Sequence, residues 1–251
     1  MKEVLVCMPY FDGGKQGREL EMSLTGWKKF AKFPFKIAII GDRNPIIDNF
    51  SFVEWVPCPR VDNIDGMYRP HIDRVNKFLT AYQIYHENEG YEGFFHICDD
   101  HYPVHDFDLD YLKQPYYLQS NFIGDISRPS NTWQHDLAKT SRLLKSNGLR
   151  TVNFTTHFPQ YYEFEKYKEI VEKFNLTTKS YVIENIYYNY FKVTPAAQAD
   201  TIRLGVWGTE DSEIKLDTIL NNPNDKRKFI ACSTKGFNET FQNKLCKYLK
   251  I

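Results

Sequence analysis

The 251-residue sequence lacks a hydrophobic run long enough to cross a membrane, and it lacks a recognisable signal peptide. Its first residues, MKEVLVCMPYF, read as a strand, and no apolar stretch approaches the roughly 18 residues of a membrane span. We therefore expect no membrane span and, by default, a cytoplasmic location. Net charge is also absent, because 32 basic residues balance 32 acidic ones. Since non-specific nucleic-acid binding needs a basic surface, a nucleic-acid partner is not favoured.

Cysteine is scarce, and its spacing forms no recognisable pattern. No two of the five cysteines make a C-x-x-C pair, so neither a disulfide framework nor a zinc cluster is expected. Cys7, Cys98 and Cys232 lie inside apolar runs and read as buried free thiols.

The first half of the chain alternates short apolar runs with amphipathic stretches. Residues 4–8, 35–40, 52–56 and 94–98 are apolar runs typical of buried strands. Between them, residues 18–30 and 73–85 carry apolar side chains at helical spacing. This order predicts an α/β fold with a mostly parallel central sheet flanked by helices. Because no repeat or linker interrupts the chain, we expect a single compact domain over residues 1–251.

Polar or glycine-rich residues follow three of the expected strands. The loop at residues 10–17, YFDGGKQG, follows the first, Asp42 the second, and Asp99 and Asp100 the fourth. In open parallel sheets ligands bind beyond the carboxyl ends of the strands, so these residues should converge on one crevice.

Adjacent carboxylates repel each other unless something offsets their charge, and a divalent cation does so. Mg²⁺ takes one or two carboxylates plus substrate phosphates, and Mn²⁺ accepts the same oxygens. The pair therefore predicts a Mn²⁺ or Mg²⁺ site, with an ordinary turn as the alternative.

The motif Asp99-Asp100-His101 resembles the Asp-x-Asp or Asp-Asp-x signature of GT-A glycosyltransferases, which binds Mn²⁺ or Mg²⁺ and the donor diphosphate. Four segments are loosely similar to the Stealth-type capsule sugar-phosphate transferases: GRELEMSL (17–24), HICDDHY (96–102), HFPQYYE (157–163) and KFIACS (228–233). The resemblance implies a GT-A-like domain and a metal-dependent glycosyltransferase. Its donor would be a nucleotide-diphosphate sugar, with a UDP-sugar the first choice, and its acceptor a saccharide or another hydroxyl compound.

The same resemblance implies roles for individual residues. In GT-A enzymes the loop after the first strand contacts the nucleotide, and the matching positions are Pro9, Tyr10, Phe11, Gly13 and Gly14. An acidic residue after the second strand commonly touches the base or ribose, and Asp42 matches it. Arg74 could reach a donor phosphate, although a solvated charge at a helix start is the alternative. A third metal ligand, commonly histidine, is assigned to His157, with His135 as its competitor.

An inverting transferase also needs a carboxylate base near the acceptor hydroxyl. Asp136, close to Trp133 and His135, is the first candidate, and Glu184 is the second. These assignments make residues 1–110 the nucleotide-sugar-binding half and residues 111–251 the acceptor-side half.

Three other functions stay open. A sugar-phosphate transferase of capsule synthesis would use the same aspartates but release a nucleoside monophosphate. A phage-type glucosyltransferase would act on a hydroxymethylated DNA base, which usually must be extruded from the duplex. A non-catalytic carbohydrate-binding protein would use the 17 tyrosines and 19 phenylalanines without needing the aspartate pair.

Overall fold

The structure is a computed structural model that describes residues 3–12, 17–61, 69–118 and 128–251. Gly13 and Gly14, expected to contact a nucleotide, lie outside the described residues. Within the part of the chain that is described, no helix has the length and hydrophobicity needed to span a membrane. All five cysteines are described and all are free thiols; Cys7 and Cys232 are buried as predicted, while Cys98 is only half-buried.

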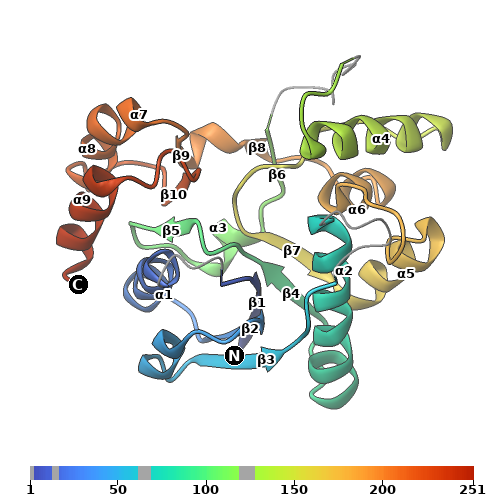
Figure 1. Cartoon of the computed structure of the whole chain (residues 1–251), viewed down its shortest axis with the longest axis horizontal. Helices are drawn as coiled ribbons and strands as arrows, with labels where there is room; N and C mark the ends of the chain where they lie inside the picture. Colours follow the sequence, from blue (N-terminus) through green and yellow to red (C-terminus); the bar gives the residue numbers. More distant parts are fainter. Residues whose placement is uncertain (1–2, 13–16, 62–68, 119–127) are drawn as a thin grey trace.

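The central sheet has five strands in the order β3-β2-β1-β4-β7 (Figure 1). β1 pairs in parallel with both β2 and β4, and β2 pairs in parallel with β3. Only β7 runs antiparallel, alongside β4. The mostly parallel sheet confirms the predicted fold class. Its strands are β1 (Val4–Tyr10), β2 (Phe35–Gly41), β3 (Val53–Pro57), β4 (Gly93–His96) and β7 (Gln160–Glu163).

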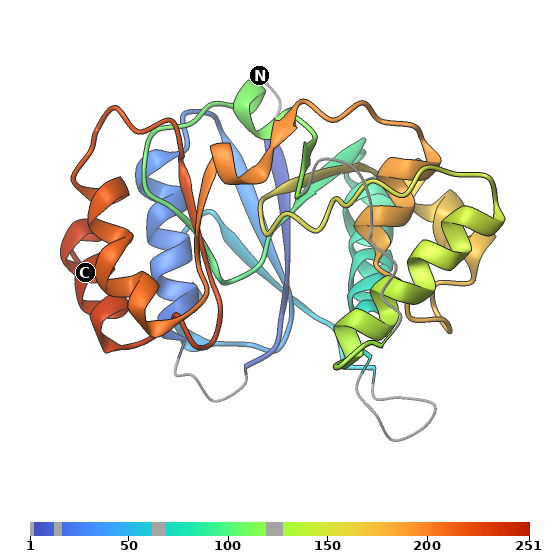
Figure 2. The ribbon, with the colours of Figure 1, turned by 90° about the horizontal axis from the view of Figure 1, so that it is seen from above.

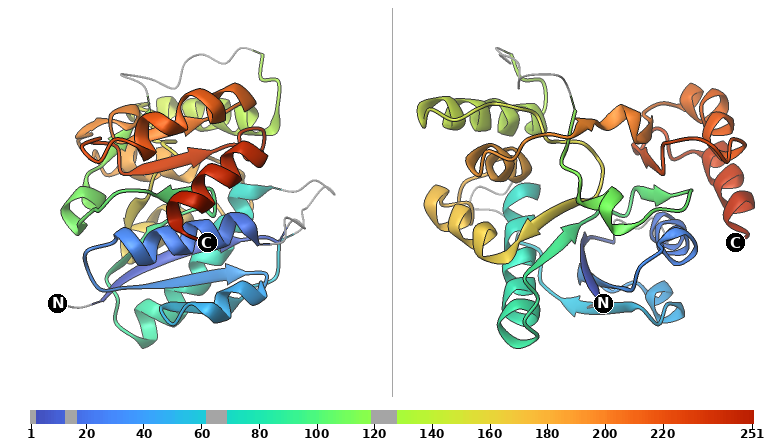
Figure 3. Two further views of the ribbon diagram at one scale, coloured as in Figure 1. Left: turned by 90° about the vertical axis from the view of Figure 1, so that its left-hand side faces the viewer. Right: turned by 180° about the vertical axis from the view of Figure 1, so that it is seen from behind.

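Helices cover both faces of this sheet (Figure 2). Side chains alternate along a strand, so Val6 and Met8 of β1 face one hydrophobic cluster while Leu5 and Cys7 face another. The first cluster is closed by α1 (Arg18–Phe30) and α9 (Glu239–Leu249), which lie side by side in Figure 3. The second is closed by α2 (Pro70–Ala81) with its π-helical continuation Tyr82–Asn88, by α5 (Phe164–Phe174) and by α6 (Ile183–Tyr190).

A smaller sheet continues from the carboxyl end of β4. It contains β5 (His101–Pro103), β10 (Phe229–Cys232) and β9 (Arg203–Val206), in the order β5-β10-β9. The turn that carries Asp99 and Asp100 therefore joins the two sheets. The backbone N–H of Cys232 donates to the carbonyl of Asp100 at 3.2 Å, which fixes this turn to β10.

The remaining elements lie around these two sheets. The two-stranded pair β6 (Tyr116–Tyr117) and β8 (Ala197–Gln198) is parallel. The other helices are α3 (Leu109–Lys113), α4 (Thr132–Ser146), α7 (Thr209–Ile214), α8 (Leu216–Leu220) and the 3₁₀ turns Pro45–Asn49 and Ala199–Thr201. The division into a nucleotide-sugar half and an acceptor half stays a prediction.

Candidate active site at the carboxyl ends of the central strands

The first loop and Asp42 lie together, as the strand order predicted. The backbone N–H of Asp12 donates to Oδ2 of Asp42 at 3.0 Å, and the N–H of Asp42 donates to the carbonyl of Tyr10 at 3.3 Å. Gly41 makes this approach possible: its φ is 133°, and a Cβ there would lie 2.2 Å from the Tyr10 carbonyl oxygen. The carboxyl ends of β1 and β2 thus form one continuous polar edge.

Two exposed aromatic rings flank this edge. Phe11 is 46% exposed, and the guanidinium of Arg60 lies 4.2 Å from its ring centroid. Trp55 is 38% exposed and donates its indole N–H to the carbonyl of Gly41 at 3.0 Å. Aromatic faces beside a carboxylate suit a nucleoside, because the base can stack while the ribose hydroxyls donate to the acid. Nothing in the local sequence around Trp55 marked it as part of this surface.

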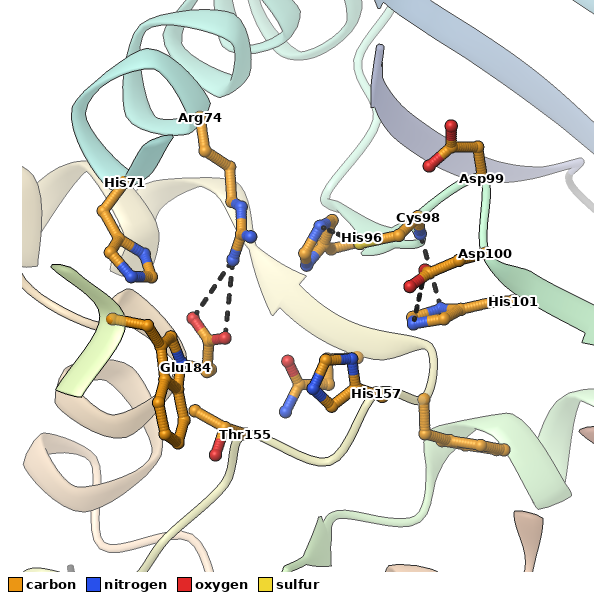
Figure 4. Close-up of a pocket in the computed structure, with 13 residues that line it drawn as sticks. His71, Arg74, His96, Cys98, Asp99, Asp100, His101, Thr155, His157 and Glu184 are labelled. Atoms are coloured by element: carbon orange, nitrogen blue, oxygen red, sulfur yellow. Dashed lines mark hydrogen bonds and ion pairs between the residues drawn. The ribbon is translucent and has the colours of Figure 1, made fainter. Parts of the chain in front are cut away.

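A pocket of about 290 Å³ opens on the other side of the Asp99–Asp100 turn (Figure 4). Side chains from the end of β4, from α2, α6 and α4, and from the segment entering β7 converge on it. Its lining comprises His71, Arg74, His96, Cys98, Asp99, Asp100, His101, Trp133, Thr155, His157, Phe158, Gln160 and Glu184.

The two aspartates point in different directions. Figure 4 draws the carboxylate of Asp99 beside β1, whereas that of Asp100 points into the pocket toward His101. Burial raises the pKa of Tyr10 to about 12, and the carboxylates of Asp12 and, more weakly, Asp99 add to the shift. Asp99 thus faces the first loop, while Oδ1 of Asp100 lies 3.7 Å from Nε2 of His101.

Cys98, Asp100 and His101 each have an atom that can bind a metal ion, and these atoms lie within 4.8 Å of one another. Burial raises the pKa of the Cys98 thiol well above its ordinary value, which disfavours the thiolate that a metal needs. Nδ1 of His101 accepts the backbone N–H of Cys98 at 3.3 Å, which assigns the proton of the neutral ring to Nε2, facing Asp100. The fitting ligand is therefore the Asp100 carboxylate, whose oxygen suits Mg²⁺ or Mn²⁺.

Of the two candidate histidines, His157 lines the pocket, whereas His135 is absent from the described lining. His157 has a left-handed backbone with φ of 46°, which is rare for a residue with a side chain. Its pKa is lowered to about 4 by desolvation and by the nearby Arg203 and Arg74, even though part of the residue is exposed. A neutral imidazole at this position can donate one hydrogen bond and accept another, and it lies outside the three-residue ligand group.

Arg74 and Glu184 form an ion pair across the pocket. Nη1 of Arg74 lies 3.4 Å from each carboxylate oxygen of Glu184, and the two side chains are 20% and 10% exposed. Burial, the largest single influence, would lower the pKa of Arg74, but the Glu184 carboxylate, with smaller contributions from Cys98, Tyr162 and Tyr167, raises it overall. Arg74 is therefore a pocket residue and not the solvated charge that a helix start allows.

The two candidate bases lie in different surroundings. Asp136 is fully buried, accepts a hydrogen bond from Ser180, and lies 3.7 Å from Nζ of Lys139. Among the described residues that line the pocket, Glu184 and Trp133 are present and Asp136 is not. The structure thus places the second candidate base in the same pocket as the aspartates and the first on the buried face of α4.

Several residues that line the pocket could not be identified from the sequence. His71, His96, Thr155 and Gln160 reach the pocket only through tertiary contacts. His96 lies inside the apolar run FFHIC, and Gln160 is in the short strand β7. Any of these polar groups could contact sugar hydroxyls, but their residue types and spacing match no motif.

The buried pocket histidines predict acid sensitivity of the fold. Burial lowers the pKa of His71 to about 3, and it holds those of His96 and His101 well below 6.5. The unfolded chain takes up these protons below pH 6.5 and the folded chain does not, so stability should fall as pH falls from 6.5 toward 3. We expect His71 alone to cost about 2 kcal/mol between pH 7 and pH 5.

Urea unfolding at pH 7 and pH 5 measures this cost. His71→Asn should reduce the difference in unfolding free energy between the two pH values, whereas the same replacement of the part-exposed His86 should change it less. An equal pH dependence in wild type and His71→Asn would contradict the assignment.

No family model matches this chain, and no curated protein matches its sequence. Among solved structures it is similar to the apo WbbM bifunctional glycosyltransferase, at 10% identity and a TM-score of 0.48, over 98% of this chain and 49% of that one. It is similar to the glycosyltransferase GlyE of Streptococcus pneumoniae TIGR4, at 11% identity and a TM-score of 0.49, over 100% and 61% of the chains. A glycosyltransferase involved in glycosylation of the PBCV-1 major capsid gives 10% identity and a TM-score of 0.42, over 99% of both chains. The chain spans about half of WbbM and three fifths of GlyE, and similarity at this level assigns it to no family.

Proposed function

We propose that this protein is a metal-dependent glycosyltransferase that moves a sugar from a nucleotide-diphosphate sugar to an acceptor hydroxyl. The observation that carries the proposal is the position of the Asp99–Asp100 turn. On one side of it lies the polar and aromatic edge of Tyr10, Phe11 and Asp42, and on the other lies the pocket with Glu184. A donor laid across the turn places its diphosphate at the aspartates, with the nucleoside and the sugar on opposite sides.

The donor nucleoside would occupy the first side. Its base can stack on the exposed rings, and its ribose hydroxyls can donate to Asp42. A UDP-sugar is our first choice of donor. The 290 Å³ pocket is at the small end of ligand sites, which suits a sugar unit and not a whole nucleotide.

The chain's own residues can hold the reacting groups as follows. Asp100 would hold Mg²⁺ or Mn²⁺, with Asp99 the second carboxylate of the turn. A divalent ion bound there would neutralise charge on the leaving diphosphate. Arg74 holds Glu184 in place, and Glu184 can accept the proton of the acceptor hydroxyl.

A panel of UDP-sugars, each with and without Mn²⁺, tests this function through the released product. Free nucleoside diphosphate supports glycosyl transfer. Nucleoside monophosphate instead supports sugar-phosphate transfer through the same site. Sugar binding without any turnover supports a carbohydrate-binding protein, and a chain that neither binds nor turns over any nucleotide sugar contradicts the proposal.

Removing the Asp42 carboxylate should weaken donor binding more than it slows the reaction. A hydrogen bond to a charged group contributes roughly 1.5–3 kcal/mol, so Asp42→Ala should raise the donor KM about 10- to 100-fold. The contact is made equally in the ground and transition states, so kcat should change little. Steady-state kinetics with varied donor concentration measures both constants.

Asp48→Ala is the matched control, because Asp48 is exposed in the 3₁₀ turn that follows and forms an ion pair with Arg43. It should leave both constants unchanged. A large loss of kcat with an unchanged KM in Asp42→Ala would place the nucleoside elsewhere.

A further inference from the structure

A second cavity, of about 420 Å³, lies beside the pocket. We call it the Trp207 cavity; it is lined by Asp200, Arg203, Leu204, Gly205, Trp207, Lys215, Thr218 and Arg227. The ring of His157, which lines the pocket, contacts the ring of Trp207 in this cavity, with centroids 5.2 Å apart. Three of the lining side chains are cationic and one is acidic, so the cavity has an excess of positive charge.

We propose that the Trp207 cavity binds an anionic group, a phosphate or a carboxylate, carried by the sugar acceptor. The inference rests on the proposed function in that it names the acceptor class for the same active site. Because the ring of Trp207 in this cavity contacts that of His157 in the pocket, an acceptor bound in the cavity would reach the pocket at His157.

Arg203 is the main reason to expect an anion, because its charged guanidinium is buried and one of its N–H groups makes no hydrogen bond to any residue that the structure describes. The residue is 2% exposed, and burial lowers its pKa below the ordinary arginine value. Its Nε donates to the carbonyl of Thr156, while its Nη1 has no hydrogen-bond partner among the described residues. A buried guanidinium with an unsatisfied N–H is costly, and an oxyanion supplies both the missing acceptor and the opposite charge.

Asp200 occupies the position that such an anion would take. Its Oδ1 lies 3.3 Å from Nη1 of Arg203, and its side chain is 64% exposed. An ion pair with one exposed partner contributes little, so the carboxylate can turn toward solvent when a ligand arrives. Asp200 is therefore a competitor for the site and not a permanent partner of Arg203.

Trp207 supplies a flat surface for the sugar ring. Arg203 and Gly205 alternate along β9 and share one face of the strand, and Trp207 follows its last residue, Val206. The indole packs onto Gly205, where a Cβ would lie 2.5–2.8 Å from three indole atoms. Trp207 is nevertheless 40% exposed, and the Arg203 guanidinium lies 5.2 Å from its ring centroid. A sugar on the indole would thus have its anionic substituent close to Arg203.

The other two cations of the cavity already have carboxylate partners. Nζ of Lys215 lies 2.7 Å from Asp211, and Nη2 of Arg227 lies 2.6 Å from Asp225. They add to the positive field, whereas Nη1 of Arg203 is a buried donor with no hydrogen-bond partner in the described part of the chain. Because Arg203 also binds the carbonyl between Thr155 and His157, which both line the pocket, a sugar held here lies next to the reacting groups.

Proton–nitrogen NMR of the indole N–H groups tests the inference without any donor or turnover. The chain has four tryptophans, and Trp207→Phe identifies the Trp207 signal. Glucose 6-phosphate should shift this signal, and glucose at the same concentration should not. Glucuronate replaces the phosphate by a carboxylate and shows which anion is preferred. Equal affinity for inorganic phosphate and glucose 6-phosphate would overturn the role of the indole.

Two variants should change the affinity for glucose 6-phosphate in opposite directions. Arg203→Gln should weaken glucose 6-phosphate binding at least tenfold. Asp200→Asn keeps the side-chain shape, removes the competing carboxylate, and should tighten binding about three- to tenfold. Glu210→Gln, an exposed acid at the start of α7, is the matched control and should leave the affinity unchanged. Unchanged or weaker binding in Asp200→Asn would overturn the inference, even if Arg203→Gln fails to fold.

Failure of this inference and failure of the proposed function give different results. A protein that shifts its Trp207 signal but turns over no nucleotide sugar would have an anion site and a different activity. If the protein is an active transferase but neither glucose 6-phosphate nor glucuronate shifts the Trp207 signal, the proposed function stands and the anionic acceptor class is contradicted.

Discussion

Replacing Asp100 with asparagine should lower turnover by roughly 10³-fold or more, because a metal ion contributes several kcal/mol of transition-state stabilisation. The substitution keeps the size of the side chain and removes the negative charge that would hold a divalent cation. The fold should survive, since the turn is fixed through the backbone carbonyl of Asp100, which asparagine retains. Turnover with a UDP-sugar and Mn²⁺ measures the loss, and a thermal melt confirms that the variant is folded.

Asp106→Asn is the matched control. Asp106 lies just beyond β5, its side chain is 65% exposed, and it pairs with Lys32 at 2.8 Å, away from the pocket lining. This variant should stay within twofold of wild type. Thorough chelation with EDTA should reproduce the effect of Asp100→Asn, and an enzyme that remains fully active after chelation would remove the metal from the proposal.

The fold was predictable where the pattern is local. Buried parallel strands need continuous apolar runs, and the residues of β1, β2 and β4 show them. β7 was not predicted, because Gln160–Glu163 is only four residues long and becomes a strand by pairing antiparallel with β4. Such pairing depends on residues more than sixty positions away, and no short sequence window contains them.

The candidate site was predictable where its residues directly follow predicted strands. Asp42, Asp99 and Asp100 follow predicted strands, so the topology of an open sheet was enough to bring them to one edge. His71 and Thr155 belong to a helix and a loop whose positions depend on packing, and their types gave no separate signal.

Asp136 shows how a local signal can mislead. The segment TWQHD places an aromatic ring and a carboxylate close together, which suggested an acceptor site. In α4, however, Asp136 shares a buried face with Leu137, Thr140 and Leu144, a helical spacing that turns it toward Ser180. Reading the whole helix for its buried face, and not four residues for their chemistry, would have placed this carboxylate inside.

Glu184→Gln should lower kcat by roughly 10²–10⁴-fold, the usual contribution of a general base. Glu184 lies in the first turn of α6, its side chain is 10% exposed, and it lines the pocket. Glutamine still offers one oxygen to Arg74 but cannot accept a proton. Because the Arg74 cation loses its balancing charge, some loss of thermal stability should accompany the variant.

A pH profile separates the base from a purely structural role. In the wild type, kcat should fall at acid pH as the base becomes protonated, and this acid limb should disappear in Glu184→Gln. A residue that only supports Arg74 would lower the rate at every pH and leave the limb in place. The measurement is kcat at saturating donor and acceptor across the pH range in which the fold stays intact.

Asp136→Asn completes the comparison. Because Asp136 is buried with Ser180 and Lys139, its replacement should cost stability while the folded fraction keeps near-normal kcat. The reverse result, a normal Glu184→Gln and an inactive but folded Asp136→Asn, would return the base to α4 and require the pocket to reach it. If both variants keep their activity, neither carboxylate is the general base. NMR of the product anomer then decides whether the enzyme retains the configuration of the transferred sugar and needs no such base.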